Sequence, residues 1–286
     1  MGKLEVHFGG HIAKNHQVSM RTLGKTLDHL QNAIDRACLE KYHGVLWKYA
    51  RMPQDLYAEA ELLVVSPREG GYILGFLAGK TFSKGLLDRV SAAIKGAVEQ
   101  SKSTGLKKSE NIAEALLKRK QQVEMGIFTP KDLQDIFDKP DKAIVRRYAD
   151  RAIVREVDQV LSIIRSDYAE DSTIEISLSD QTSAKYGFNR TSAQNFHSVI
   201  TRKQLGEPIL YRGRIMSMDR KNLSGKFQNA VTDKGSRLRF SNEDSFQEVI
   251  SFFDKNIIFT FIGCPYIEYG AFDPNAGDIY YVGLKA

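Results

Sequence analysis

The chain has 286 residues, 42% of them hydrophobic, so it is long enough for one large domain or two ordinary ones, each with a real core. Its two cysteines, Cys38 and Cys264, exclude a disulfide framework and any C-x-x-C motif, and this composition favours a reducing cytoplasm. The net charge of +6 permits a nucleic acid or an acidic protein as partner without requiring either.

The chain opens with signals for a strand and a long helix. Leu4–Phe8 alternates apolar and polar residues, which is typical of a half-buried strand, and two glycines end it. Ser19 is a suitable N-cap for a helix that runs to about Tyr42.

A hairpin follows the helix. Two β-rich runs, Glu61–Ser66 and Tyr72–Leu77, flank a turn that contains proline and glycine. Residues 1–82 therefore predict an α+β domain, in which a small antiparallel sheet carries a packed helix on one face.

The middle of the chain, residues 83–205, changes to helical periodicity. The pattern predicts several amphipathic helices, the longest over Asp141–Arg165, and one alternating strand over Thr173–Leu178. We expect this mainly helical region to complete the N-terminal body.

Residues 206–286 predict a small β-barrel domain, which completes an α+β fold of sheet, central helices and barrel. Short β-type runs alternate there with turn signals, a pattern typical of small closed barrels. The runs are Ile209–Tyr211, Arg237–Phe240, Ile257–Ile262 and Asp278–Val282.

Positive charge is concentrated in the first half of this barrel segment. Between Arg202 and Arg239 there are ten basic residues and three acidic ones, an excess larger than the net charge of the whole chain. On a strand, residues two apart share a face, so Arg212 and Arg214 form one such pair, and Arg237 and Arg239 another. The predicted nucleic-acid-binding residues are Arg212, Arg214, Arg220, Lys221, Lys226, Arg237 and Arg239.

Aromatic residues are interleaved with these basic ones, and two interpretations remain open. Barrels that bind single strands combine a basic groove with stacking aromatic side chains. Alternatively, the aromatic residues fill the barrel core and the arginines are ordinary solvent-facing residues. The set comprises Tyr211, Phe227, Phe240, Phe259, Phe261, Tyr266, Tyr269, Tyr280 and Tyr281.

Three other groups could carry chemistry. His7, His11 and His16, with Glu5, suggest a metal site, but His7 fits a solvated strand face as well, so we expect no metal or other cofactor. Gly9 and Gly10 could form an anion-binding nest, although a tight turn is the preferred interpretation.

The third group is an acidic row, Asp132, Asp135, Asp138 and Asp141, with the three-residue spacing of a helix face. Pro140 interrupts that helix, so we expect a solvated face rather than a magnesium site. Cys38 and Cys264 are interpreted as buried structural residues. No residue is assigned a catalytic role.

Both ends of the chain resemble a group of uncharacterised prokaryotic proteins. The resemblance rests on Val6–Gly10, which contains F-G-G, on the hairpin turn Val64–Gly71, and on the closing stretches Phe261–Cys264 and Asp278–Leu284. The resemblance implies a bacterial or mobile-element protein with an N-terminal α+β domain and a C-terminal small barrel. Some members occur near phage-defence genes, which implies an accessory role and transfers no catalytic residue.

We therefore expect a cytoplasmic, non-enzymatic accessory binding protein, in antiphage defence, whose basic barrel contacts nucleic acid or an acidic protein. We also expect a homo-oligomer or a member of a multi-protein complex, with no membrane partner, since no segment has the length of a membrane span. One alternative is a metal-dependent nuclease or hydrolase of a defence system. The other is a purely structural or oligomeric interaction protein.

Overall fold

The computed structural model describes residues 2–44, 46, 50–68, 72–103, 111–166, 171–273 and 277–285. The chain divides into two compact units. Among the described residues, the first unit takes in residues up to 103 and residues 149–201. The second takes in residues 111–148 and 202–285. The compact units therefore cut across the predicted middle region, 83–205, because residues 111–148 group with the barrel.

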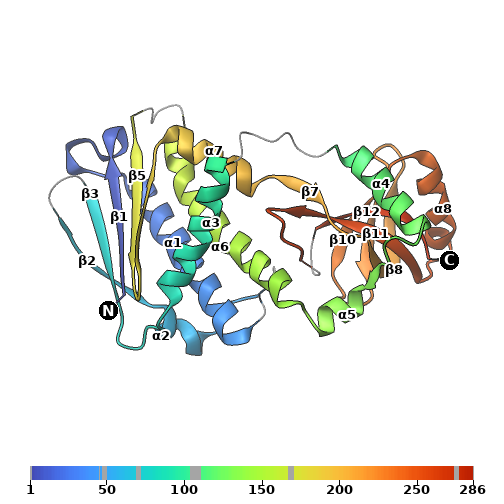
Figure 1. The fold of residues 1–286 in the computed structure, drawn as a ribbon, viewed down its shortest axis with the longest axis horizontal. Coiled ribbons are helices and arrows are strands. Elements are labelled where there is room, and N and C mark those ends of the chain that lie inside the picture. Colours follow the sequence, from blue (N-terminus) through green and yellow to red (C-terminus); the bar gives the residue numbers. More distant parts are fainter. Residues whose placement is uncertain are drawn as a thin grey trace. The chain divides into compact units, whose positions relative to one another are not determined.

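The first unit is built on a five-stranded antiparallel sheet with the order β2-β3-β1-β5-β6 (Figure 1). Its strands are β1 (Lys3–Gly9), β2 (Leu62–Arg68), β3 (Tyr72–Ala78), β5 (Thr173–Ser179) and β6 (Ser183–Phe188). Leu4, Val6 and Phe8 are fully or almost fully buried, whereas the residues between them are half-buried, so β1 has one face on the core. This is the alternation that the sequence predicts for Leu4–Phe8.

Helices cover the buried face of this sheet (Figure 1). The helices of this unit are α1 (Met20–His43), α2 (Tyr57–Ala60), α3 (Leu86–Ser103), residues 149–165 of α6 (Lys142–Arg165) and α7 (Arg190–Ile200), with short 3-10 helices η1 (Gly10–His16) and η2 (Gln54–Leu56) in the connections. The predicted cap of α1 is confirmed, since the Ser19 hydroxyl accepts a hydrogen bond from the Thr22 amide at 3.1 Å. Gly44, at a φ of 65°, ends the helix in the left-handed conformation that glycine tolerates best.

The second unit contains a closed five-stranded barrel. Its strands are β8 (Ile209–Asp219), β9 (Ser224–Asn229), β10 (Gly235–Arg239), β11 (Phe259–Glu268) and β12 (Asp278–Leu284). They pair in the order β8-β9-β10-β12-β11, and the β8–β11 pairing closes the ring. The pairing of β10 with β12 is parallel and the others are antiparallel. The predicted fold class, α+β with a C-terminal small barrel, is confirmed.

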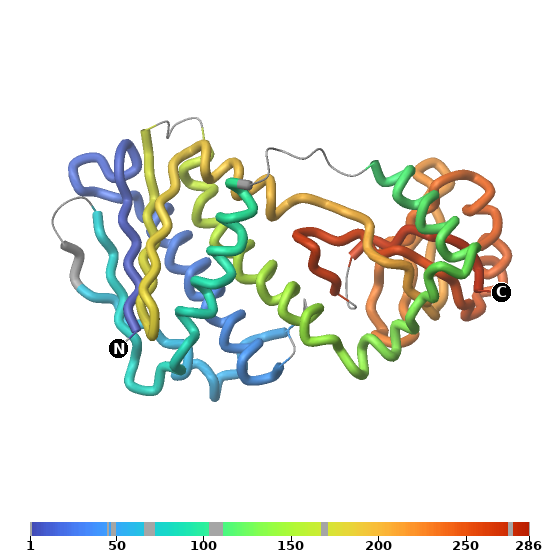
Figure 2. The backbone as a smooth tube through the Cα atoms, viewed as in Figure 1, coloured from blue at the N-terminus to red at the C-terminus, as the bar shows by residue number. Residues whose placement is uncertain are grey.

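Smaller elements complete this unit (Figure 2). They are α4 (Ile112–Glu124), β4 (Lys131–Asp132), α5 (Leu133–Asp138), β7 (Lys203–Leu205) and α8 (Glu243–Asp254). β4 extends the sheet beside β8, and β7 extends it beside β11. Helix α8 connects β10 to β11 and packs Phe246 and Val249 into the barrel core.

Aromatic rings fill the barrel. Phe227 and Phe261 meet edge to face with centroids 5.1 Å apart, and Phe259 stacks on Phe261 at 5.3 Å. Such contacts add to the stabilisation from burying apolar area. Gly213 of β8 leaves room for these rings, because a Cβ there would lie 2.6 Å from the ring of Phe227.

Candidate functional site

Five of the seven predicted basic residues lie on barrel strands and point outward. On β8, Arg212 and Arg214 alternate with Tyr211, Gly213 and Ile215, which are buried. On β10, Arg237 and Arg239 flank the buried Leu238. Each arginine pair therefore shares the outer face of its strand, as the spacing predicts.

The three strands that carry these residues are neighbours in the barrel. On β9, Lys226 is exposed and lies directly opposite Arg237 of β10 and Ser217 of β8. Arg214 lies opposite Gln228, the next outward residue of β9. We call the outer surface formed by Arg212, Arg214, Lys226 and Arg237 the cationic face.

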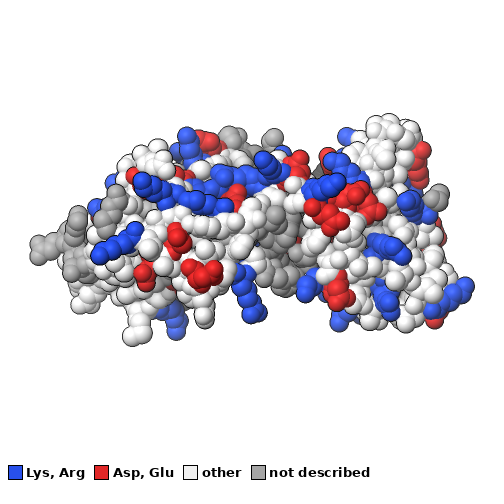
Figure 3. Space-filling view, turned by 90° about the horizontal axis from the view of Figure 1, so that it is seen from below, with Lys and Arg blue, Asp and Glu red and all other residues white. Residues whose placement is uncertain are grey.

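Nearby carboxylates neutralise other members of the predicted set. Arg239 Nε lies 2.6 Å from an oxygen of Asp278, and Arg220 Nη2 lies 2.7 Å from an oxygen of Glu243. Asp219 ends β8, and hydrogen bonds from the side chain and backbone of Asn222 lower its pKa; the positive charge of Arg237 adds to this effect. The seven basic residues therefore do not form one uninterrupted positive surface. On the face of the molecule in Figure 3, basic and acidic groups are interspersed.

The structure decides between the two interpretations of the barrel aromatic residues. Six of them are buried in the barrel core: Tyr211, Phe227, Phe240, Phe259, Phe261 and Tyr281. For these six, the interpretation as core residues is right, and none can stack on a ligand. Tyr266, Tyr269 and Tyr280 are half-buried.

The histidine and carboxylate group at the N-terminus is not assembled into a metal site. His7 and Glu5 share the half-buried face of β1, but the described residues contain no group of three or more potential ligands placed to hold a metal ion. The backbone amides of His11 and Ile12 donate to Asp171 Oδ1 at 3.2 Å and to Ser172 Oγ at 3.1 Å. A nest for an anion would need these amides. Gly9 ends β1, and Gly10, at a φ of 69°, begins the 3-10 helix η1, so the chain enters a short helix where the sequence predicts a tight turn.

The acidic row is divided between two helix starts. Asp132 caps α5, since its side chain accepts from the Gln134 amide at 2.8 Å. Asp141 accepts from the Ala143 amide at 2.7 Å at the start of α6. All four aspartates of the row are exposed. Capping accounts for the two outer carboxylates, and the row is a solvated face, as predicted.

Neither cysteine is placed for nucleophilic chemistry. Cys38 and Cys264 are fully buried. Burial raises the pKa of the Cys38 thiol to about 11 and that of the Cys264 thiol to about 12. A catalytic cysteine needs the opposite shift, toward the thiolate.

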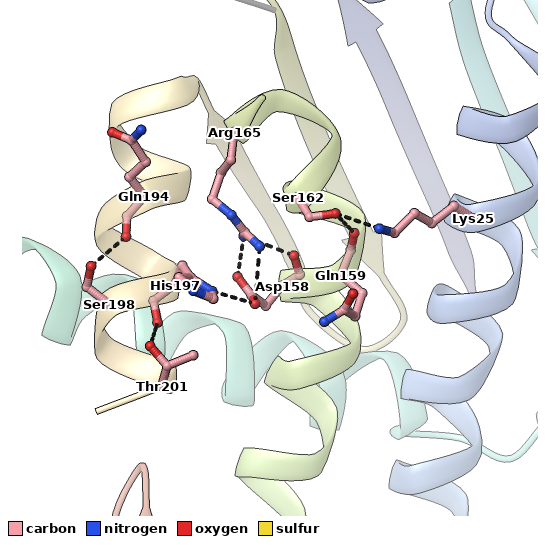
Figure 4. Close-up of polar contacts among 9 residues, drawn as sticks. All are labelled: Lys25, Asp158, Gln159, Ser162, Arg165, Gln194, His197, Ser198 and Thr201. Carbon is pink, nitrogen blue, oxygen red and sulfur yellow. Dashed lines mark hydrogen bonds and ion pairs between the residues drawn. The ribbon is translucent and has the colours of Figure 1, made fainter. Parts of the chain in front are cut away.

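The structure brings together one polar cluster that the sequence analysis missed (Figure 4). Asp158 of α6 is 3% exposed, and its carboxylate contacts both the guanidinium of Arg165 and Nδ1 of His197, the latter at 2.9 Å. The His197 side chain, from α7, is 44% exposed. A signal was present, because Asp158 interrupts the apolar stripe of α6 between Val154 and Leu161, and a buried carboxylate needs partners.

The chemistry open to this cluster follows from its hydroxyl neighbours. When the imidazole is neutral, donation from Nδ1 to Asp158 leaves Nε2 as the acceptor, which a serine hydrolase would use to activate a hydroxyl. The hydroxyls drawn in Figure 4 are engaged elsewhere, since Ser198 donates to the carbonyl of Gln194 at 2.9 Å and Thr201 to that of His197 at 2.8 Å. The cluster therefore fastens α7 to α6.

Two further findings concern membrane spans and similarity to known proteins. Within the described ranges, none of the helices combines the length and hydropathy that crossing a bilayer requires. Neither a protein-family model, nor a curated protein, nor a solved structure matches this chain.

Proposed function

We propose that this protein is a non-enzymatic binding protein whose barrel contacts the phosphate backbone of a nucleic acid through the cationic face. One observation carries the proposal. Arg212, Arg214, Lys226 and Arg237 point outward from three adjacent strands, and no ion pair joins any of them to a carboxylate within the described part of the chain. The carboxylate of Asp219 lies near enough to Arg237 for their charges to interact. Positive side chains that are not held in ion pairs can release condensed counterions from phosphates, which is the main source of backbone affinity.

The architecture of the barrel supports the same proposal. In the five-stranded Greek-key barrels of the OB-fold, the second and third strands and the loops beside them bind oligonucleotides or oligosaccharides. Here the second and third barrel strands are β9 and β10, which carry Lys226 and Arg237. Because one fold serves many functions, the proposed function rests on the charged residues of the barrel and not on its topology.

A phosphate ligand is favoured over an acidic protein by the type and spacing of the residues. Three of the four side chains are arginines, whose planar guanidinium matches a phosphate with two parallel hydrogen bonds. They are distributed over neighbouring strands rather than gathered in one pocket, which suits a ligand that presents phosphates in a row.

The proposal extends to the setting of the protein. We place it in the cytoplasm, as an accessory protein of bacterial or mobile-element origin acting in antiphage defence, and as a homo-oligomer or a member of a larger complex. The resemblance of both chain ends to proteins that are sometimes found near phage-defence genes supports the setting. Molar mass measured by light scattering tests the oligomer, and a monomer at all concentrations would contradict it.

Binding to labelled oligonucleotides at several salt concentrations tests the central proposal. If four phosphates are contacted, the logarithm of the affinity should fall with the logarithm of the salt concentration with a slope of about −3. Replacing Lys226→Glu together with Arg237→Glu should abolish binding. Lys95→Glu is the control, since Lys95 is an exposed residue of α3 in the first unit. An affinity that changes neither with the salt concentration nor with the double substitution would overturn the proposal.

A further inference from the structure

Two tyrosines differ from the other aromatic residues of the barrel strands. Tyr266 of β11 and Tyr280 of β12 are half-buried, while the remaining aromatic residues of the described barrel strands are buried in the core. The pairing register explains why. Tyr280 alternates with the buried Ile279 and Tyr281, and it lies opposite Cys264, two positions before Tyr266. Both rings therefore stand on the outer side of the barrel.

The two rings form a pair with a basic residue at each end, Lys203 and Arg239, each of which also meets a carboxylate, Glu268 and Asp278 respectively. Their centroids are 5.6 Å apart and the planes meet at 75°, so one ring presents its edge to the face of the other. Lys203 Nζ lies 5.3 Å from the centroid of Tyr266, and Arg239 is the register partner of Tyr280 on β10. We call Tyr266 and Tyr280 the tyrosine pair.

The tyrosine pair adjoins the cationic face, with the Arg239–Asp278 ion pair between them. Arg237 and Arg239 both point outward on β10, and β10 pairs with β9 on one side and with β12 on the other. Crossing the strands from Lys226 through Arg237 leads to Asp278 of β12, and two residues further along the same strands Arg239 lies opposite Tyr280. A ligand whose phosphates lie on the cationic face would bring its next nucleotides onto the tyrosine pair.

We propose that the ligand of this surface is a single-stranded nucleic acid whose bases stack on Tyr266 and Tyr280. The proposal rests on the function proposed above and names its substrate class. In a duplex the base faces are stacked on one another and cannot reach an outward ring. In a single strand they are available, and aromatic rings beside arginines or lysines bind them with little sequence preference.

Packing accounts for only part of the arrangement. Tyr280 lies against a small apolar cluster that includes Leu116 of α4, Cys264 and Val282, so one part of its ring has a structural role. Tyr266 is not part of that cluster, and its contacts with Lys203 and Tyr280 leave it half-exposed. Tyr266 is therefore the better position for a test.

The first experiment compares a fluorescein-labelled thymidine oligonucleotide with a duplex of equal length. The wild type should bind the single strand more tightly. Tyr266→Leu should weaken single-strand binding by about tenfold, within the range expected for the loss of one stacked base, and should leave duplex binding unchanged. Tyr266→Phe keeps the ring and should retain the affinity.

The second experiment does not depend on the stability of a variant. A single strand that carries 5-iodouracil, irradiated while bound to the wild-type protein, should cross-link to Tyr266 or Tyr280, which peptide mass spectrometry would identify. Salt-sensitive binding with cross-links only elsewhere, or equal affinity of Tyr266→Leu for the single strand, would overturn the stacking proposal and leave the proposed function standing. Absence of any nucleic-acid binding by the wild type would overturn both.

Discussion

Lys226 and Arg237 lie directly opposite each other on β9 and β10, both exposed on the outer face of the barrel. Like charges at directly opposed positions of a sheet are destabilising. Lys226→Thr removes this repulsion and introduces a residue that suits strands, so it should raise the free energy of unfolding by about 0.5 kcal/mol. The same substitution should weaken nucleic-acid binding, because it removes one of the phosphate contacts. Urea unfolding and oligonucleotide titration check the two effects.

A substitution two residues beyond Arg237 on the same face supplies the control. Arg239 forms an ion pair with Asp278, so Arg239→Thr should lower the free energy of unfolding, by up to about 1 kcal/mol for a half-exposed pair. If Lys226→Thr raises the free energy of unfolding and Arg239→Thr lowers it, the charges beside each residue determine the change in stability. A loss of stability for both would contradict the repulsion between Lys226 and Arg237.

Arg89 joins three helices of the first unit. From α3, its Nε lies 2.5 Å from Glu40 of α1 and its Nη1 lies 2.7 Å from Asp150 of α6, and its side chain is 10% exposed. Arg89→Met would remove, in a mostly buried place, the guanidinium that contacts both carboxylates. We expect the free energy of unfolding to fall by about 3–5 kcal/mol in urea titrations.

Matched variants separate lost charge compensation from lost packing. Lys95→Met on the same helix breaks only an exposed pair, in which Nζ lies 3.9 Å from Glu99, and should change stability by less than about 0.5 kcal/mol. Adding Glu40→Gln and Asp150→Asn to Arg89→Met removes the two carboxylate charges that Arg89 contacts and should recover part of the loss. If the triple variant is no more stable than Arg89→Met, the loss comes from packing.

Local signals in the sequence predict the elements that depend on neighbouring residues. The Ser19 cap and the apolar spacing after it locate α1, and the alternation of Leu4–Phe8 locates β1. The alternation of Thr173–Leu178 likewise predicts β5. What the sequence does not show is that β5 pairs with β1, about 170 residues earlier in the chain. Such a pairing depends on loop closure and on the packing of the whole unit, which no local pattern records.

The elements that the sequence analysis missed have weak or atypical patterns. β6 lies at the edge of its sheet and contains serine, lysine and glycine, which are not typical of strands, so the sequence pattern does not reveal it. β9 buries Gly225, Phe227 and Asn229, of which only Phe227 is typical of a strand interior. Helix α8 did carry a signal, since Asn242 caps it and accepts from the Ser245 amide at 2.9 Å.

The sequence predicts one part of the candidate site, the outward direction of its arginines, and not their ion-pair partners. Alternation along β8 and β10 places the arginines outward, and this can be inferred from sequence. The sequence does not reveal which of these arginines form ion pairs with carboxylates. Asp278 reaches Arg239 only because the barrel closes, and Glu243 reaches Arg220 only because of the position of α8.

Asp88 should make the stability of the protein depend on pH in the acid range. From the first turn of α3, its carboxylate accepts from the Gln181 and Thr182 amides, each at 3.1 Å, and from the Thr182 hydroxyl at 2.5 Å. Burial alone would raise the pKa of Asp88, but these hydrogen bonds outweigh it and lower the pKa below the ordinary value of 3.8. A lowered pKa in the folded state means that stability from Asp88 is present above pH 3.8 and is lost as the pH falls through the folded-state pKa.

Urea midpoints at a series of pH values would measure this contribution. The wild type should exceed Asp88→Asn by a constant difference near neutral pH, and the difference should shrink in the most acidic samples. Asp135→Asn, at an exposed position of α5, gives the same change of net charge and should show no such trend. A difference between the wild type and Asp88→Asn that stays constant down to the acid limit would contradict the role of these hydrogen bonds.

The two cysteines should not react with thiol reagents while the protein is folded. Both side chains are 0% exposed, so a reagent cannot reach either sulfur. Burial also raises the pKa of Cys38 to about 11 and that of Cys264 to about 12, so both thiols are protonated at neutral pH and the reactive thiolate is scarce. Titration with a chromogenic disulfide should release no thiolate from the native protein and two equivalents in denaturant. Because Cys38 belongs to the first unit and Cys264 to the second, Cys38→Ala and Cys264→Ala variants would report separately on the opening of each unit. Immediate reaction of one equivalent in the native protein would show that the corresponding core is open in solution.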